Sequence, residues 1–342
     1  MTVTVRSFAK VNLGLYIGAR RADAYHDLRT VYQTIALRDV VRVTVGRGRG
    51  IAIRCEHPQV PCDESNTCYR IVERIMRELG AKGRVTIEIE KRLPVQGGLG
   101  AASSNGVATM VALERALRKP LAGPARLRIA AEVGSDLPLF LVGGTVLGVG
   151  RGEEVYPLPD LPPLPMVVVT PDIAVSTPRA FEDWDALVAG GAVELCSART
   201  DGGARPSIDA KLTHGEASAR LLEVGCVLSA WLALPNTGAP AKGGSRAGSL
   251  LLDLVRTGIE NDFERVVFPQ YPELRDIKRA LEGAGARYAS LSGSGSALYG
   301  LFRSRAEAER AAGHLRKQGL KAVATATLTR TQYWKRLLIA GR

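Results

Sequence analysis

The chain has 342 residues, of which 46% are hydrophobic and 23% are charged. This composition is typical of a globular protein with one large core or two ordinary ones, and it excludes a disordered chain. The formal net charge of +12 favours polyanionic partners such as nucleotides, nucleic acid or acidic lipid. The basic residues are scattered and form no stripe interleaved with aromatic residues, so we expect no nucleic acid partner.

The five cysteines are odd in number and lack the CxxC spacing of a zinc site. Reduced thiols are therefore expected instead of a disulfide framework. The first residues alternate like a strand and do not form the apolar core of a signal peptide. No apolar run reaches the roughly 18 residues that cross a membrane. We expect a cytoplasmic protein without a membrane partner.

In the first half of the chain, alternating apolar residues predict strands that are interleaved with helices. Strands are expected around residues 11–17, 41–45 and 85–89. Residues 66–79 place their apolar side chains on one helical face, and Gly80 follows where a helix stop is expected.

The second half is predicted to be a separate unit. Residues 156–171 are rich in proline and predict a connection between the two halves. A strand, a helix and a strand follow one another over residues 297–327, which is typical of the last limb of a ferredoxin-like split βαβ arrangement. Residues 190–213 and 236–249 are rich in Gly, Ala, Ser and Arg, and we interpret them as mobile loops.

A glycine- and serine-rich loop runs from Pro94 to Asn105, between a predicted strand and a helix expected to begin at Ser103 or Ser104. Small residues let the backbone approach an anion, and the free N–H groups at a helix start supply donors and positive potential. An ordinary turn with serine caps is the alternative for such a loop taken alone. The chain lacks GxxxxGK[ST], and Ser103 stands where the third glycine of GxGxxG would fall. A P-loop ATPase and a dinucleotide site are therefore disfavoured.

This loop resembles the P-x-x-x-G-L-G-x-x-S-S-N motif of the GHMP kinases, the superfamily of galactokinase, homoserine kinase and mevalonate kinase. Residues 7–12 (SFAKVN) and 290–296 (SLSGSGS) are similar to the N-terminal and C-terminal motifs of the same superfamily. The resemblance implies a two-domain α+β fold. An N-terminal ATP-binding α/β domain with a left-handed βαβ-type unit would span residues 1–160. A C-terminal ferredoxin-like substrate-binding domain would span residues 161–342, with an insertion near 190–245.

Further residues are similar to one branch of the superfamily, the kinases that act on 4-diphosphocytidyl-2-C-methyl-D-erythritol in the non-mevalonate isoprenoid pathway. Residues 20–28 resemble the R-x-D-G-Y-H-x-L segment of that branch, whose Tyr-His pair is not general in the superfamily. Residues 134–140 and 261–264 resemble its G-[AS]-D-[IV]-P-F-F and N-D-L-E segments. The resemblance implies transfer of the γ-phosphate of ATP to the 2-hydroxyl of that alcohol.

The chain also departs from the pattern of that branch. Ala24 replaces the usual glycine before Tyr-His, where a positive φ would be costly for any other residue. Gln96, Ala101 and Ala102 stand where the family loop is mostly glycine. These departures keep open the alternative of an inactive kinase.

Two residues are the candidates for catalysis. Asp136 lies at a predicted helix end, and phosphoryl transfer to a hydroxyl needs a carboxylate within reach of its proton. From the residues alone Asp136 is either this base or a capping aspartate, and the resemblance favours the base. Lys10 lies in an apolar strand, where an inward head group needs a partner. It would pair with Asp136 and stabilise charge on the transferred phosphoryl group.

The resemblance assigns the remaining site residues. ATP would be bound by Asn66, Pro94, Gly97, Gly98, Leu99, Gly100, Ala101, Ala102, Ser103, Ser104 and Asn105, with helix capping as the alternative for Asn66. The acceptor would be bound by Asn12, Tyr25, His26, Phe181, Gly293 and Ser294. Tyr25 and Phe181 would enclose the cytosine while His26 reads its edge. Core packing is the alternative for Phe181, and a structural histidine is the alternative for His26.

The expected partners are therefore ATP and a cytidyl diphosphate alcohol, with a monomer and a homodimer both open. No dedicated metal cluster is evident in the sequence, so Mg²⁺ would arrive with ATP, with Ser104 as a candidate ligand. Three alternatives remain: a GHMP kinase acting on homoserine, mevalonate or a sugar, a non-catalytic RNA-binding protein, and an inactive kinase.

Overall fold

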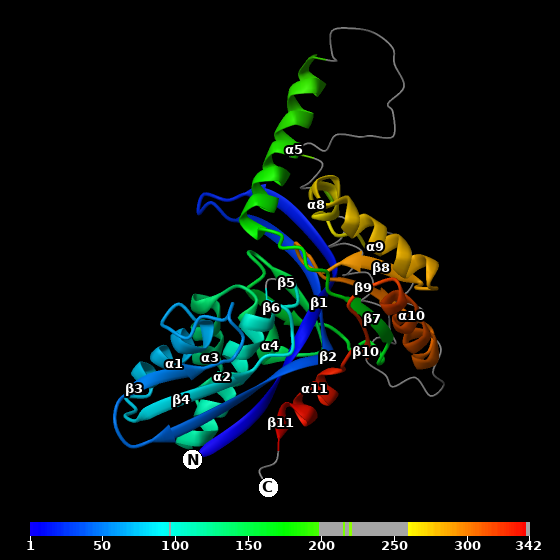
Figure 1. The fold of residues 1–342 in the computed structure, drawn as a ribbon. Coiled ribbons are helices and arrows are strands. Elements are labelled where there is room, and N and C mark those ends of the chain that lie inside the picture. Colours follow the sequence, from blue (N-terminus) through cyan, green and yellow to red (C-terminus); the bar gives the residue numbers. More distant parts are fainter. Residues whose placement is uncertain (96, 198–214, 216–218, 221–258, 340–342) are drawn as a thin grey trace.

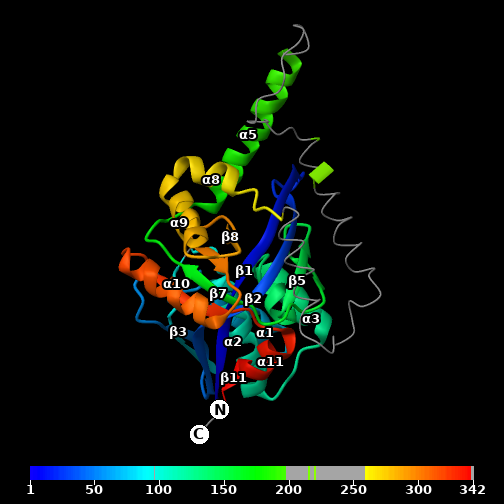
Figure 2. The same cartoon turned by 90° about the vertical axis from the view of Figure 1, so that its right-hand side faces the viewer.

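The structure, a computed structural model, describes residues 1–95, 97–197, 215, 219–220 and 259–339. These residues form two sheets with helices packed against each of them (Figures 1 and 2). The prediction for Gln96 and the predicted loop at 236–249 lie outside the described residues.

The first sheet has seven strands in the order β11-β1-β2-β4-β3, with β5 beside β2 and β6 beside β5. Its strands are β1 (Thr2–Arg20), β2 (His26–Gly46), β3 (Gly50–Arg54), β4 (Arg84–Glu90), β5 (Thr145–Val149), β6 (Glu154–Pro157) and β11 (Leu338–Ile339). The helices packed on this sheet are α1 (Thr67–Glu78), α2 (Ala101–Leu117), α3 (Gly123–Val133) and α4 (Leu137–Val142). Strands β3 and β4 are parallel, and α1 connects them.

The second sheet has four antiparallel strands in the order β10-β7-β9-β8. Its strands are β7 (Pro165–Val169), β8 (Tyr288–Leu291), β9 (Leu298–Leu301) and β10 (Ala322–Ala326). The helices of this half are α5 (Thr177–Ser197), α8 (Glu264–Gln270), α9 (Pro272–Gly283) and α10 (Arg305–Lys317). This order, with helices before β8 and between β9 and β10, is the predicted ferredoxin-like arrangement.

The chain then returns to the first sheet. Helix α11 (Arg330–Leu337) is followed by β11, which pairs with β1. The last two described residues thus add an edge strand to the sheet in which the chain began. The domain boundary near residue 160 stays a prediction.

The two sheets are connected by the long hairpin of β1 and β2, which rises from the first sheet toward α5 (Figure 1). Near the start of β1, Val5 and Phe8 belong to the core of the first sheet, whereas Leu15 and Ile17 belong to the core of the second half. The middle of β1 therefore lies where the two halves meet.

Three predicted boundaries were wrong. Helix α2 begins at Ala101, because Gly100 takes a left-handed conformation that turns the chain directly into the helix. The proline-rich stretch at 156–171 contains β7, a central strand whose first residue is Pro165. Helix α5 continues to Ser197, so the described part of the predicted loop at 190–213 is helical.

The departure at Ala24 has the predicted backbone cost. Ala24 has a φ of +67°, in the left-handed region that favours glycine. We expect Ala24→Gly to raise the free energy of unfolding by about 0.5–1 kcal/mol, measured by urea denaturation. The matched control is Ala306→Gly in the first turn of helix α10, where glycine relieves no strain and should instead lower stability slightly, by less than the roughly 1 kcal/mol of a helix interior. Equal destabilisation at both positions would contradict the strain at Ala24.

Candidate active site

Two cavities share the glycine-rich loop as part of their walls. The larger has a volume of about 640 Å³ and the smaller about 300 Å³, sizes typical of small-molecule sites. Gly98, Gly100 and Ser103 line both cavities. A phosphate group held at these residues would therefore be in reach of a second molecule in the neighbouring cavity.

The loop has room only for glycine at its two points of closest approach. Gly98 has a φ of +71°, and a Cβ atom there would collide with the carbonyl oxygen of Ser292. Gly100 has a φ of +65°, and a Cβ atom there would lie 3.0 Å from Cγ of Lys10. The backbone of the loop is thus pressed between β1 and the C-terminal glycine-rich motif.

Hydrogen bonds from both sides hold the loop in this position. The N–H of Lys10 donates to the carbonyl of Leu99 at 3.0 Å. From the second half of the molecule, the hydroxyl of Ser292 donates to the carbonyl of Gly98 at 2.9 Å. The N–H of Ala297 donates to the carbonyl of Gly97 at 3.1 Å. The N-terminal and C-terminal motifs therefore meet at the loop between them.

The start of helix α2 can bind an anion. No side chain among the described residues caps this helix, so the N–H groups of its first turn need another acceptor. The hydroxyl of Ser103 lies where both cavities meet. Ser104 lines neither cavity, because its hydroxyl is buried and accepts a hydrogen bond from Ser7 at 2.7 Å.

A buried carboxylate that the sequence analysis missed anchors both ends of the loop. Asp39 accepts from the Lys91 ammonium at 2.8 Å and from the N–H groups of Arg92 and Leu93 at 2.7 Å each. It also accepts from the side-chain amide of Asn105 in α2 at 3.2 Å. Asp39 is far from the loop in sequence, and nothing in its neighbourhood marks it as special.

Lys10 and Asp136 form an ion pair in the wall of the larger cavity. Nζ of Lys10 lies 3.4 Å from Oδ2 of Asp136 and donates to Oδ1 of Asn12 at 2.7 Å. Register shifts after Phe8 and after Asn12 flank these two β1 residues, and such bulges re-aim side chains. The Lys10 side chain is buried, whereas that of Asp136 is 33% exposed.

The capping alternative for Asp136 is wrong. Asp136 occupies the N-cap position of α4, but its side chain makes no capping hydrogen bond. Its other oxygen, Oδ1, accepts from the hydroxyl of Tyr32 at 3.1 Å. Tyr32 was missed by the sequence analysis because it looks like one more apolar residue of an alternating strand.

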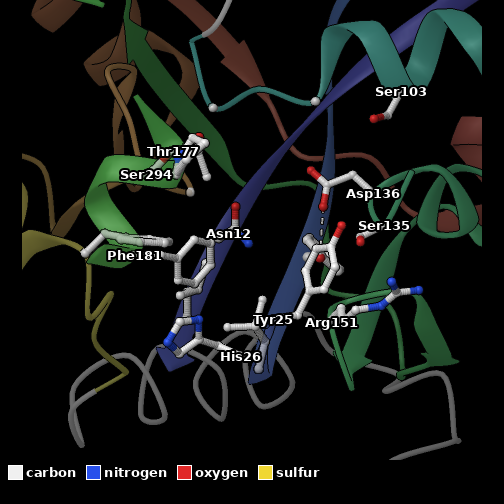
Figure 3. A pocket seen from close by; sticks show the side chains of 18 of the residues that line it. Asn12, Tyr25, His26, Ser103, Ser135, Asp136, Arg151, Thr177, Phe181 and Ser294 are labelled. Carbon is white, nitrogen blue, oxygen red and sulfur yellow. Dashed lines mark hydrogen bonds between the residues drawn. The ribbon is translucent and has the colours of Figure 1, made fainter. Parts of the chain in front are cut away.

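Aromatic side chains gather at the other end of the larger cavity. The rings of His26 and Phe181 are stacked with their centroids 4.9 Å apart, and Nε2 of His26 lies 2.6 Å from Oδ1 of Asp185. Tyr25 is 53% exposed, and the guanidinium of Arg151 lies 4.8 Å from the centre of its ring. Figure 3 shows Phe181 across the cavity from Asp136.

The C-terminal motif contributes Gly293 and Ser294 to the same cavity. The hydroxyl of Ser294 lies 2.7 Å from that of Thr177 at the start of α5. The side-chain amide of Asn261 donates to the carbonyl of Gly293 at 2.8 Å. These contacts fix the motif beside Lys10 and Asn12.

The structure brings together nearly all of the predicted site residues. The larger cavity is lined by Lys10, Asn12, Tyr25, His26, Asp136, Phe181, Gly293 and Ser294, and the smaller by Asn66, Pro94, Gly97, Leu99, Ala101, Ala102 and Asn105. Asn66 also caps helix α1, since its side chain accepts from the N–H of Cys68 at 2.8 Å. Phe181 likewise has two roles, since it packs against the core of the second half and lines the larger cavity.

Neither a metal cluster nor a membrane span is found in the part of the chain that the structure describes. No group of three or more His, Cys, Asp or Glu side chains in these residues could hold a metal ion. None of the helices here is both long and apolar enough to cross a membrane.

Comparison with known proteins gives the class that this fold and site define. Residues 66–144 match the GHMP kinases N terminal domain, and residues 246–321 match the GHMP kinases C terminal domain. The chain is 35% identical to 4-diphosphocytidyl-2-C-methyl-D-erythritol kinase of Solibacter usitatus over 88% of its own length and 81% of that protein.

Solved structures agree with this result. A crystal structure of 4-(cytidine 5'-diphospho)-2C-methyl-D-erythritol kinase superposes with a TM-score of 0.67 at 28% identity, covering 95% of this chain and 98% of that one. Homoserine kinase from Cytophaga hutchinsonii has the same TM-score at 18% identity, covering 96% and 95%, and so shares the fold. Within the GHMP kinases, the chain belongs to the family of 4-diphosphocytidyl-2-C-methyl-D-erythritol kinases.

The close approach at Gly98 leads to a stability and binding prediction. Gly98→Ala should lower the free energy of unfolding by about 2 kcal/mol or more and weaken ADP binding, because the methyl group meets backbone at a positive φ. Urea denaturation and calorimetric titration with ADP measure the two effects. The control is Gly46→Ala, where a Cβ atom would find nothing within 4 Å. The same small effect at both positions would refute the steric constraint.

Proposed function

We propose that this chain transfers the γ-phosphate of ATP to the 2-hydroxyl of 4-diphosphocytidyl-2-C-methyl-D-erythritol. The observation that carries the proposal is the position of the Lys10–Asp136 pair, which lines the larger cavity beside the loop shared with the smaller one. The smaller cavity would hold ATP, and the larger would hold the alcohol. Family membership and the aromatic end of the larger cavity support the choice of alcohol.

The reaction needs a base and a cation at the same place. The acceptor oxygen forms a bond to the γ-phosphorus, the bond from that phosphorus to the β,γ-bridging oxygen breaks, and ADP leaves. The hydroxyl proton passes to the Asp136 carboxylate. A general base must lie within hydrogen-bond reach of the proton that it accepts. Lys10 and the N–H groups at the start of α2 stabilise the negative charge on the transferred group.

The available oxygen donors fit a Mg²⁺ ion that arrives with the nucleotide. Mg²⁺ takes one or two protein ligands and fills its other positions with phosphate oxygens and water. The hydroxyl of Ser103 lines both cavities and would supply such a ligand, whereas the Asp136 carboxylate is kept for the acceptor proton. Bound Mg²⁺ would neutralise part of the phosphate charge. Ser103 replaces Ser104 as the candidate serine ligand of Mg²⁺, because the Ser104 hydroxyl is hydrogen-bonded to Ser7.

The cytosine of the alcohol would be recognised at the hairpin between β1 and β2. Tyr25 presents an exposed ring for stacking, and Phe181 faces the same cavity. His26 is held by Asp185 at Nε2, which leaves Nδ1 for the hydrogen-bonding edge of a base. These roles of Tyr25, Phe181 and His26 are part of the proposal.

A substrate panel tests the assignment directly. The purified chain would be assayed by coupled ADP release with ATP, Mg²⁺ and one alcohol at a time: the cytidyl diphosphate alcohol, homoserine, mevalonate or galactose. Turnover of the cytidyl alcohol alone is expected. Turnover of a different alcohol without the cytidyl one would reject the proposed acceptor.

Removing the base should stop the chemistry but leave nucleotide binding. Asp136→Asn is expected to lower kcat by about 10²- to 10⁴-fold, with ADP affinity little changed. The exposed Asp276 of α9 is the control, since Asp276→Asn should leave both quantities unchanged. Near-normal turnover of the Asp136 variant would exclude it as the base.

Removing the stacking ring should instead weaken acceptor binding. Tyr25→Ala is expected to raise the KM for the cytidyl alcohol by about 5- to 150-fold, equivalent to losing about 1–3 kcal/mol of stacking. Tyr156→Ala is a matched control, because Tyr156 is 54% exposed and outside the lining of this cavity. Steady-state kinetics measure both variants. An unchanged KM for the Tyr25 variant would remove Tyr25 from the acceptor site.

A further inference from the structure

We infer that Tyr32 is a positioning residue, which orients the Asp136 carboxylate by donating a hydrogen bond from its hydroxyl to Oδ1. The inference rests on the proposed function in one respect, the role of Asp136 as base. The two oxygens of this carboxylate have different partners. Oδ1 accepts from the Tyr32 hydroxyl at 3.1 Å, and Oδ2 lies 3.4 Å from the ammonium of Lys10.

The carboxylate needs such a restraint. The terminal torsion of an aspartate is broad, so its plane is poorly fixed by the side chain alone. Asp136 makes no capping hydrogen bond to α4 and is 33% exposed. With Tyr32 on one oxygen and Lys10 on the other, the plane of the carboxylate is defined. Oδ2, beside Lys10, is then the oxygen that is placed to receive the proton.

Tyr32 is itself held firmly. It lies in the middle of β2, where its backbone pairs with Asn12 of β1 on one side and with Val146 of β5 on the other. The side chain is buried, and the ammonium of Lys10 lies 5.6 Å from the centre of its ring. A group fixed by neighbours on both sides can impose its geometry on Asp136, which lies at the start of a short helix.

Two glycines make room for the phenol. A Cβ atom at Gly148 would lie 2.5 Å from Cε2 of Tyr32, and a Cβ atom at Gly152 would lie 2.5 Å from its hydroxyl oxygen. Phenylalanine would fill the apolar part of this space equally well. The hydroxyl is therefore the part of the residue that needs a separate explanation, and its hydrogen-bond acceptor is Asp136.

The phenol remains a donor at neutral pH. Burial raises the pKa of Tyr32 well above its usual value, and the charge of Asp136 and its hydrogen bond raise it further. Charged groups near the phenol include Lys10 on β1, Asp136 at the start of α4 and Glu153 after β5. Glu153 is itself paired with Arg151 at 2.9 Å.

The test is Tyr32→Phe, which removes only the hydroxyl. We expect kcat to fall by about 10- to 100-fold, because a misplaced base loses reactive geometry, while KM for ATP and for the alcohol stays within about two-fold. Tyr333→Phe is the matched control. The Tyr333 hydroxyl is also buried and donates to the carbonyl of Phe140 at 2.7 Å, but the residue lines neither cavity. Thermal melts of both variants separate a folding defect from a catalytic one.

A double-mutant cycle tests whether Tyr32 acts through Asp136. Adding Tyr32→Phe to Asp136→Asn should cause no further loss of kcat, because the group to be oriented is already gone. An independent loss in both backgrounds would overturn the inference, as would an unchanged kcat in the single variant or a change confined to KM.

Failure of the inference and of the proposed function are distinguishable. The ratios between variants would be measured with whichever alcohol of the panel the unmodified chain phosphorylates, so a different acceptor leaves the test of Tyr32 intact. An unmodified chain without any kinase activity would overturn both.

Discussion

The structure depends on the close passage of one loop between two other segments. At Gly98 the loop backbone lies against the carbonyl of Ser292, and at Gly100 it lies against the side chain of Lys10. Neither position has room for a side chain without rearrangement, and both have a left-handed backbone. Because only backbone stands between the two cavities at Gly98 and Gly100, the cavities lie close enough for a phosphoryl group to pass from one to the other.

Several elements that are far apart in the sequence depend on this passage. The bulged part of β1 places Lys10 and Asn12 beside the loop, and the start of α4 places Asp136 against Lys10. The tip of the β1–β2 hairpin brings Tyr25 and His26 toward α5, which carries Phe181 (Figure 2). Neither half of the molecule contains a complete site.

Much of this could be predicted from the sequence because short motifs carry the loop chemistry. The loop, Lys10 and Asp136 were identified from segments of a few residues, and the structure brings them together. The strained backbone at Ala24 was also predicted from a single missing glycine. In each case the signal is local, since backbone conformation and the order of motifs can be read along the chain.

The features that the sequence analysis missed are contacts between residues far apart in the sequence, which leave no local signal. Asp39, Tyr32 and Asp185 contact the site residues Asn105, Asp136 and His26, which are distant from them in sequence, and each looks ordinary among its neighbours. The choice between Ser103 and Ser104 depended on where α2 begins, because a shift of two residues along a helix changes which side chain faces the cavity.

The most direct test of this account is a crystal structure with a non-hydrolysable ATP analogue and the cytidyl diphosphate alcohol bound together. The account predicts the nucleotide in the smaller cavity, with its γ-phosphate at Gly98, Gly100 and Ser103. The acceptor hydroxyl should lie within hydrogen-bond distance of the Asp136 carboxylate, and the cytosine should lie against the ring of Tyr25. A γ-phosphate and an acceptor hydroxyl that bind apart from each other and from Asp136 would contradict it.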